Sequence, residues 1–424
     1  MSDWVEYKIC DIGEVIGGGT PKTKVAEYWN GSIHWLTPKD LSNYKYRYIS
    51  SGDRNISEKG LKNSSARLLP EGTVLLTSRA PIGYIAIAQN EITTNQGFRS
   101  IVLNDGFCSE FVYYLLSANT DYLKSHASGT TFQELSGSSL KNLSFVFPPH
   151  PEQKVIAHIL GTLDDKIELN QKMNETLEAI ARAIFKSWFV DFDPVRAKAE
   201  GRQPEGMDAE TASLFPDSFE DSELGMIPRG WKAGKLGDDF DIVMGQSPPG
   251  TTYNEEENGL PFYQGNRDFG FRYPTRRVYC SAPKRMAKKG DTLVSVRAPV
   301  GAINMAAENC CIGRGVAAVR HKSGSRSYTS YSLRHLQEKF GVYESEGTVF
   351  GSINKKDFND LTFILTDPTI IERFEKLAFP FDESVESNSK EILTLIKIRD
   401  VLLPKLMSGE IKIKDVASIQ GEIL

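Results

Sequence analysis

The amino-acid sequence carries one pattern twice, in the same order and at a constant spacing. The segment Arg79–Gly83 reads RAPIG, and Arg297–Gly301, 218 positions later, reads RAPVG. Other pairs agree at that spacing, namely Gly72 with Gly290, Gly97 with Gly315, Asp164 with Asp382, Asn170 with Asn388 and Leu177 with Leu395. One shared turn could arise by chance, but ordered matches at one spacing indicate a duplication. We therefore expect two similar halves, each with its own core.

The two copies differ in length near their starts. There the spacing is 227 positions, as in Trp4 with Trp231 and Thr20-Pro21 with Ser247-Pro248. The change from 227 to 218 places about nine extra residues in the first copy, between about residues 40 and 69.

Each copy consists of a mixed block followed by a helical segment. In the blocks, short runs rich in β-branched residues, such as Val74–Thr77 and Thr292–Ser295, are separated by Gly, Pro and Asn, which is typical of strands joined by turns. Residues 111–123 and 327–340 have helical periodicity. The predicted fold class is α+β, with two duplicated, strand-rich blocks.

The helical segments carry apolar residues at steps of three and four, as long paired helices of the coiled-coil type do. In the first segment these are Ile156, Ile159, Leu163, Ile167, Met173, Leu177, Ile180, Ile184 and Trp188, and in the second Phe374, Leu377, Phe381, Val385, Leu395, Ile398 and Leu402. Equivalent helices that pair across a twofold axis must run in opposite directions. We therefore predict two long antiparallel helices in a pseudo-twofold arrangement.

The pairing register follows from a kink that Gly161 and Pro380 predict in the two helices. Beyond that kink the first helix is centred near Leu177. We expect residues 173–180 to pack against 391–398, with Leu177 close to Leu395. Asn170 and Asn388 should interrupt the seam as equivalent polar residues, which can fix the register.

The predicted organisation follows from the duplication and the helical segments. It comprises the first mixed block at 1–150, a central spacer helix at 151–190, an acidic connector at 191–229, the second mixed block at 230–368, a C-terminal spacer helix at 369–410 and a tail at 411–424.

The charge is unevenly distributed along the chain. The net charge is −5, yet residues 1–150 are neutral, 151–222 carry −7 and 223–368 carry +4. Screening confines such fields to about 10 Å, so an acidic chain can have a basic DNA-binding face. There is no apolar run long enough to cross a membrane, no secretory signal, and the five cysteines form no CxxC pair. We expect a cytoplasmic protein.

The sequence offers no convincing catalytic or metal-binding constellation. His34, His126, His150, His158, His321 and His335 are scattered without ligand spacing. The loop Gly17–Lys22 lacks the ending of a nucleotide-binding P-loop, and neither Pro-Pro pair is preceded by the acid or amide that an amino-methyltransferase needs. The alternatives left open are a methyltransferase or nuclease, and a scaffold that binds only protein.

Candidate DNA-contacting residues are polar and basic side chains at turns. Arginine can hold a phosphate or read guanine with two hydrogen bonds, and hydroxyl and amide groups can bond phosphates. The candidates are Thr20, Lys22, Lys39, Arg79, Gln96, Arg99, Thr130, Thr131, Gln133, Gln246, Ser247, Arg267, Arg272, Arg276, Arg297, Arg314, Thr348 and Ser352. The competing interpretations are arginines that bond local carbonyls, surface salt bridges and solvated loops.

The chain resembles the specificity subunits of type I restriction–modification systems. The resemblance covers nearly all of it and is most specific at three motifs, PHPEQK at 149–154, FKSWFVDFDP at 185–194 and LPKLMSGEI at 403–411. It implies that each mixed block is a target-recognition domain for one half of a split, asymmetric double-stranded DNA target, with the helices as a spacer. It also implies a non-catalytic role.

The resemblance implies partners as well. Modification subunits, two of them, would carry S-adenosylmethionine and methylate adenine. Restriction subunits would add ATP- and Mg²⁺-dependent translocation and cleavage. No cofactor and no metal is expected in this chain itself.

Overall fold

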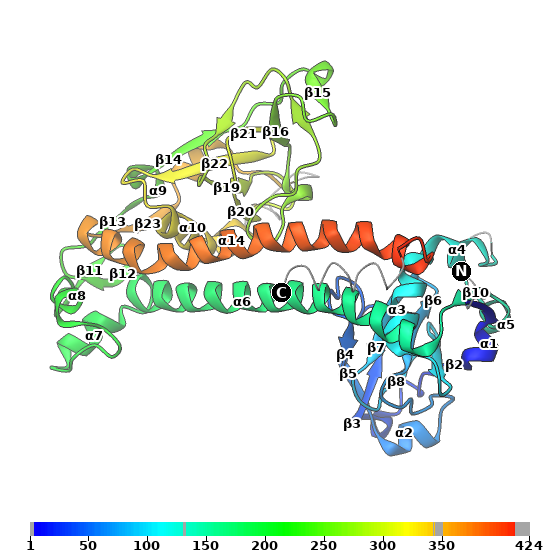
Figure 1. Ribbon diagram of the computed structural model, residues 1–424. Coiled ribbons are helices and arrows are strands. Elements are labelled where there is room, and N and C mark those ends of the chain that lie inside the picture. Colours follow the sequence, from blue (N-terminus) through cyan, green and yellow to red (C-terminus); the bar gives the residue numbers. More distant parts are fainter. Residues whose placement is uncertain (1–3, 130–132, 342, 344–350, 412–424) are drawn as a thin grey trace, which may run out of the picture. The chain divides into compact units, whose positions relative to one another are not determined.

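Two units make up the chain in the computed structural model, which describes residues 4–129, 133–341, 343 and 351–411 (Figure 1). Unit 1 comprises Met1–Lys172 and Ser389–Leu424, and unit 2 comprises Met173–Asn388. Each unit therefore combines one mixed block with parts of both long helices.

Unit 1 is built on mixed sheets, in which β4 with β7 and β3 with β8 are parallel and the other pairs are antiparallel. Its five-stranded sheet has the order β2 (Gly13–Gly17), β9 (Arg99–Leu103), β6 (Val74–Ser78), β7 (Ile82–Ala88) and β4 (Tyr48–Ile49), and its three-stranded sheet has the order β5 (Arg54–Ile56), β3 (Trp29–Leu36) and β8 (Thr93–Thr94). A further pair is β1 (Val5–Lys8) with β10 (Ser144–Phe147). The short helices are α1 (Ile9–Ile12), η1 (Ala26–Tyr28), α2 (Glu58–Lys62), α3 (Ser109–Ala118), α4 (Thr120–Ser125) and α5 (Gly137–Lys141).

Unit 2 has a four-stranded and a five-stranded sheet. The first has the order β14 (Phe240–Met244), β22 (Val316–His321), β19 (Thr292–Ser295) and β20 (Ile303–Met305), and the second β15 (Tyr253–Asn254), β17 (Tyr279–Cys280), β16 (Leu260–Tyr263), β21 (Cys310–Ile312) and β18 (Met286–Ala287). Two-stranded pairs are β11 (Phe219–Ser222) with β12 (Gly225–Pro228), and β13 (Lys232–Lys235) with β23 (Thr362–Leu365). The short helices are α7 (Asp193–Ala199), α8 (Ala209–Ser213), α9 (Leu236–Asp239), η2 (Gly250–Thr252), η3 (Asn266–Asp268), α10 (Arg326–His335), α11 (Gln337–Phe340) and α13 (Lys355–Asn359).

The duplication is visible in the topology. The order β2-β9-β6-β7 in unit 1 is repeated as β14-β22-β19-β20 in unit 2. The pair β1 with β10 recurs as β13 with β23, and the parallel pair β3 with β8 recurs as β16 with β21. The predicted α+β class with two strand-rich domains is confirmed.

The strands β6 and β19, which occupy equivalent inner positions in the repeated sheets of the two units, are buried on both faces. In β6, Val74 and Leu76 belong to the core that faces α3 and the long helices, whereas Leu75 belongs to the core beneath the second sheet. In β19, Val294 belongs to the main core of unit 2 and Leu293 belongs to a second, smaller core. Side chains alternate between the two faces of a strand, so an uninterrupted apolar run fits a strand enclosed on both sides.

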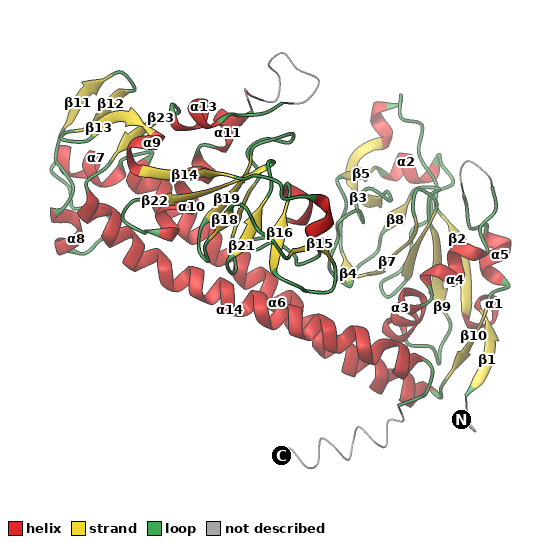
Figure 2. Cartoon of the chain, turned by 90° about the horizontal axis from the view of Figure 1, so that it is seen from above, coloured by secondary structure: helices red, strands yellow, loops and turns green. Residues whose placement is uncertain are grey.

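Two helices of 40 residues each, α6 (His150–Phe189) and α14 (Pro368–Met407), are packed side by side within each unit (Figures 1 and 2). In unit 1, Asn170 Nδ2 donates to Glu391 Oε2 at 2.9 Å and Arg399 Nη1 donates to Asp164 Oδ1 at 2.9 Å. A rising residue number on α6 thus meets a falling one on α14, so the helices are antiparallel, as predicted.

The predicted register of these helices is wrong. In unit 2, Asn388 Nδ2 donates to Asn174 Oδ1 at 3.0 Å, a pairing that puts Leu177 level with Val385, ten positions from Leu395. The error has a simple source, because α6 continues unbroken through Gly161 and its centre therefore lies before Leu177. Within α14, Pro380 likewise does not end the helix.

Four residues predicted for the seam lie outside it. Met173, Ile180, Leu377 and Ile398 are 44%, 42%, 42% and 43% exposed. The buried face of α6 instead includes polar side chains, namely Asn170, Asn174 and Glu178. Asn170 does interrupt the seam as predicted, but its partner is Glu391.

The segment 191–229, predicted as a connector without periodic structure, contains α7, α8 and the β11–β12 hairpin. Phe192, Val195, Phe215 and Ile227 are buried in the main core of unit 2. This segment is therefore an integral part of that unit.

Candidate DNA interface

The RAPxG turns follow the central strands β6 and β19, and glycine is required at their last position. Gly83 has φ +101° and Gly301 has φ +87°, a region that glycine enters at low cost. A Cβ at Gly83 would lie 2.4 Å from Thr120 Cγ2, and one at Gly301 would lie 2.6 Å from Phe340 Cβ. Each turn thus packs closely against a short helix, α4 in unit 1 and α11 in unit 2. This contact fixes the position of the turn and of the arginine that begins it.

Sheet topology brings the predicted loops of unit 1 to one edge. Because β2, β9 and β6 are antiparallel neighbours, the end of β2, the start of β9 and the end of β6 meet there. The Gly17–Lys22 loop is bonded to the turn before β9, with Gly19 N donating to Thr94 O at 2.8 Å and Thr20 Oγ1 donating to Gln96 Oε1. A Cβ at Gly18 would lie 2.0 Å from Asn95 O, so this contact also needs glycine.

Two arginines of this edge share one carboxylate. Arg99 Nη2 donates to Glu134 Oε1 at 2.9 Å, and Arg79 Nη1 lies 3.7 Å from Glu134 Oε2. The Arg99 side chain is 21% exposed and also donates to Phe98 O, whereas that of Arg79 is 40% exposed. Arg79 is therefore more accessible to a ligand than Arg99. We call the residues Thr20, Arg79, Gln96, Arg99, Gln133 and Glu134 loop cluster 1.

Unit 2 repeats the arrangement with other side chains. Gln246 N donates to Ile312 O at 3.0 Å, Arg314 N donates to Ser247 Oγ at 3.3 Å, and Arg297 forms a backbone bridge with Ser352. Gln246, Arg297, Arg314 and Ser352 are exposed. We call these four residues and Ser247 loop cluster 2. At the position of Glu134 it has Ser352, and at that of Gln96 it has Arg314.

The remaining basic candidates lie on loops near these edges. Lys22 is exposed and follows the Gly17–Gly19 turn. Lys39 is exposed and lies 3.6 Å from Asp53, and Arg267 is exposed on η3. These three remain predictions. Thr130, Thr131 and Thr348 lie outside the described residues.

The basic cluster predicted around Tyr273 does not form. Arg272 is 1% exposed, and its guanidinium contacts Tyr331 and Asp382, so the prediction that it contacts DNA is wrong. Arg276 is exposed at the surface but pairs with Glu308 at 2.6 Å, and Arg277 pairs with Asp268 at 2.7 Å. Sequence proximity had suggested one patch, whereas the three side chains have separate acidic partners.

Two features of the edge were missed from sequence. Glu134 was missed because an acidic residue is not expected on a DNA-binding surface. The other is a tryptophan pair behind the glycine loop, in which Trp29 and Trp35 meet edge to face at 5.1 Å and Trp35 Nε1 donates to Gly19 O at 2.9 Å. Arg54 Cζ lies 3.6 Å from the centroid of the Trp29 ring, so the arginine makes a cation–π contact with the tryptophan pair.

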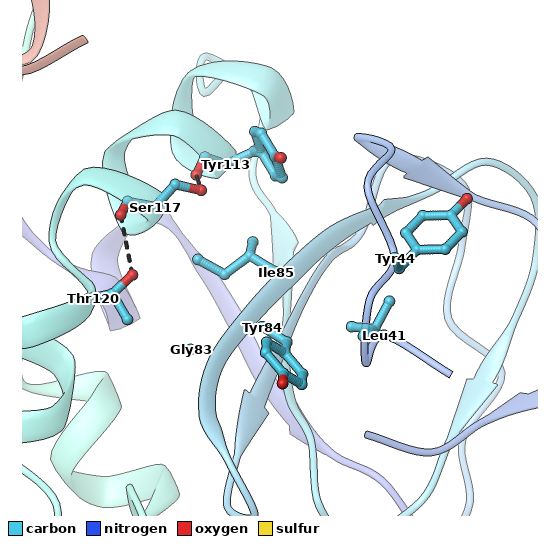
Figure 3. A pocket seen from close by; sticks show the side chains of 8 residues that line it. All are labelled: Leu41, Tyr44, Gly83, Tyr84, Ile85, Tyr113, Ser117 and Thr120. Atoms are coloured by element: carbon cyan, nitrogen blue, oxygen red, sulfur yellow. Dashed lines mark hydrogen bonds between the residues drawn. The ribbon is translucent and has the colours of Figure 1, made fainter. Parts of the chain in front are cut away.

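A pocket of about 210 Å³ in unit 1 offers no catalytic group (Figure 3). Its eight described lining residues include Tyr44, Tyr84 and Tyr113, but no carboxylate, histidine, cysteine or lysine. The hydroxyls of Ser117 and Thr120 donate to backbone carbonyls of their own helical segment. Burial raises the pKa of Tyr44 and Tyr113 to about 12, so both phenols are protonated near neutral pH.

Over the described residues, no group of three or more His, Cys, Asp or Glu side chains is placed to bind a metal ion. Among the helices in the described part of the chain, none is long and apolar enough to cross a membrane.

Comparison with known proteins gives consistent matches. Residues 1–179 match the type I restriction modification DNA specificity domain. The chain is 38% identical to the MjaIX specificity subunit of Methanocaldococcus jannaschii, across 98% of this chain and 95% of that protein. It is 28% identical to the HindI specificity subunit of Haemophilus influenzae, across 97% and 100%. The crystal structure of a type I S subunit from M. genitalium has the same fold, with a TM-score of 0.62 at 18% identity over 95% of this chain and 96% of that one.

Proposed function

The chain belongs to the specificity subunits of type I restriction–modification systems, and on that premise we propose that it reads a split DNA target, one half with each loop cluster. The observation that carries the proposal is the repeated edge, where equivalent turns present arginine and amide side chains in both units. Arg79 is half-buried there, and the exposed residues are Gln96, Gln246, Arg297 and Arg314. The clusters differ at equivalent positions, with Gln96 against Arg314 and Glu134 against Ser352. Different side chains favour different bases, so the two half-sites should differ.

As a DNA specificity subunit the chain is a non-catalytic component, and the chemistry belongs to its partners. We propose that two modification subunits with S-adenosylmethionine methylate adenine, and that restriction subunits supply ATP- and Mg²⁺-dependent translocation and cleavage. The long helices would carry these subunits and set the gap between half-sites. The complex would work in the cytoplasm.

A selection experiment tests the split target. The complex with its modification subunits is incubated with random double-stranded DNA, and bound molecules are sequenced. We expect two short, different sequences separated by a gap of fixed length and free sequence. A continuous site, or no enrichment at physiological salt, would contradict the proposal, and the latter would favour a scaffold that binds only protein.

The arginines of the two turns give the sharpest prediction about readout. Arg79→Ala should relax base preference in one half-site only, and Arg297→Ala in the other only. A bidentate base contact contributes about 1–3 kcal/mol of discrimination, whereas a lost phosphate contact would lower the salt slope of binding by about one. Arg297→Ala should have the larger effect, because Arg79 is already held by Glu134. The measurement is binding of cognate and singly substituted targets at several salt concentrations.

Two outcomes would contradict this prediction. If both variants alter the same half-site, the clusters do not divide the target. If neither changes affinity, salt slope or base preference, these arginines serve only to shape the turns. Arg202→Ala is the control, since Arg202 is an exposed arginine of unit 2 that is paired with Glu200 and is not among the candidate DNA-contacting residues.

The rigorously purified chain should transfer no methyl group to DNA and cut no DNA. The reason is that no group of three or more His, Cys, Asp or Glu side chains among the described residues is placed to bind a metal ion, and that neither Pro-Pro pair is preceded by the acid or amide that an amino-methyltransferase needs. Transfer of labelled methyl groups is measured for the chain alone and after modification subunits are added. Methylation by the chain alone would disprove the prediction.

A further inference from the structure

Unit 2 buries an arginine of its recognition domain against both long helices. The Arg272 side chain is 1% exposed, and Nη2 donates to the Tyr331 hydroxyl at 2.9 Å. Its Nη1 lies 3.2 Å from Asp382 Oδ1 on α14, and Nη2 lies 3.3 Å from Glu178 Oε2 on α6. Arg334 of α10 lies 3.2 Å from Glu178 Oε1, and Arg182 of α6, whose side chain is 59% exposed, donates to the same oxygen at 2.9 Å.

Unit 1 also buries an arginine that contacts a tyrosine of its own domain and a carboxylate of a long helix. The Arg47 side chain is 8% exposed, Nη1 donates to the Tyr114 hydroxyl at 2.8 Å, and Nη2 donates to Asp165 Oδ1 at 2.7 Å on α6. The Tyr114 hydroxyl donates to Asp164 Oδ2 at 2.6 Å, and Arg399 of α14 donates to the other oxygen of Asp164. Here Arg47 and Tyr114 of the recognition domain reach two aspartates of α6, and the link to α14 runs through Asp164 and Arg399.

The backbone shows that the two arginines are equivalent. The Arg47 carbonyl accepts the N–H of Ile87, and the Arg272 carbonyl accepts the N–H of Met305, each at 2.9 Å. Ile87 and Met305 are 218 positions apart, the spacing of the duplication. The arginines are 225 positions apart because they lie in the region where the copies differ in length. Sequence matching at one spacing therefore did not find them.

Gly161 makes room for the first of these arginines. A Cβ at Gly161 would lie 2.8 Å from Arg47 Nη1 and 3.5 Å from its Cζ. The glycine in the first half of α6 thus leaves space for the guanidinium group. The Arg47 side chain of the recognition domain therefore packs against α6 at the position of Gly161.

Stability alone does not explain such groups. Burying charges costs solvation energy, and well-packed apolar residues often serve as well or better. What a planar guanidinium adds is fixed geometry, because its donors must meet two acceptors in defined directions. An arginine bonded to a tyrosine of its own domain and to carboxylates of the long helices permits one orientation of the domain on the helix pair.

We propose that Arg47 and Arg272 are positioning residues that hold each recognition domain at one place on the helix pair and thereby sharpen selectivity for the gap between the half-sites. This inference rests on the proposed reading of a split target. The arginines act through the domains that they orient and do not touch DNA themselves.

The test compares targets that differ only in the gap. The complex with its modification subunits is titrated with the selected target and with targets whose gap is one base pair shorter or longer. For the natural chain we expect the correct gap to be preferred strongly. Arg272→Met should reduce that preference by about tenfold, equal to about 1.4 kcal/mol in relative binding free energy, and leave base preference within each half-site unchanged. Arg272→Lys should retain an intermediate preference, since lysine keeps the positive charge but lacks the planar guanidinium group with its several donors.

Arg202→Met is the control, because Arg202 is an arginine of the same unit whose side chain is 62% exposed, pairs with Glu200 and is not among the candidate DNA-contacting residues. It should leave the gap preference unchanged. Arg47→Met provides an independent measurement in unit 1 should Arg272→Met fail to fold. If both folded Met variants keep the natural preference for the gap and only lose thermal stability, the proposal is overturned. Failure of the natural chain to prefer any gap would instead reject the split target, before a variant is measured.

Discussion

Inserting seven residues into each long helix should lengthen the preferred gap between half-sites and leave both half-site sequences unchanged. The insertions are placed between Lys172 and Met173 in α6 and between Asn388 and Ser389 in α14, where the two units divide. Seven residues add about 10.5 Å to a helix. They turn it by only about 20°. At about 3.4 Å per base pair, the gap should grow by about three base pairs.

Both insertions are needed because the helices are antiparallel and hydrogen-bonded in register. With equal insertions the bond between Asn170 and Glu391 in unit 1 and that between Asn174 and Asn388 in unit 2 are both retained. An insertion in α6 alone should abolish binding of any target. The measurement is selection from random DNA, as for the natural complex. An unchanged gap, or new bases within a half-site, would contradict the spacer function of the helices.

The duplicated framework was predictable because it depends on local sequence. The runs at Val74 and Thr292 are short, rich in β-branched residues and bounded by turns, and both became central strands. The predicted loops meet because the ends of antiparallel neighbours share an edge, which follows from topology. Of the candidate residues, Arg79, Gln96, Arg297 and Arg314 reached that edge for this reason.

The helix register was not predictable from apolar periodicity. Glu178 and Asp382 are 6% and 1% exposed, whereas Met173 is 44% exposed. A pattern search assigns the apolar residue to the seam, yet the polar ones are buried because partners distant in sequence satisfy them. Arg272, the partner of both carboxylates, was assigned to the DNA surface on the same local reasoning.

Phe374→Ala should destabilise unit 2 by about 3–5 kcal/mol, the usual cost of removing a buried phenyl ring. Phe374 is fully buried on α14. Its ring centroid lies 5.4 Å from that of Phe189 and 5.7 Å from that of Phe185, both on α6, and 6.2 Å from that of Tyr331 in the recognition domain. The ring thus joins three elements, and its loss leaves a cavity among large aromatic groups that cannot collapse onto one another.

Thermal unfolding of the full chain measures this effect. For a unit of this size each kcal/mol lowers the midpoint by about 2–4 °C, so the unit 2 transition should fall by roughly 6–20 °C. Leu377→Ala is the control on the same helix, because Leu377 is 42% exposed and its truncation should change stability by no more than about 0.5 kcal/mol. Equal shifts for the two variants would show that the aromatic cluster does not hold α14 to its unit. A normal transition for Phe374→Ala would show that the cavity is filled by rearrangement of neighbouring rings.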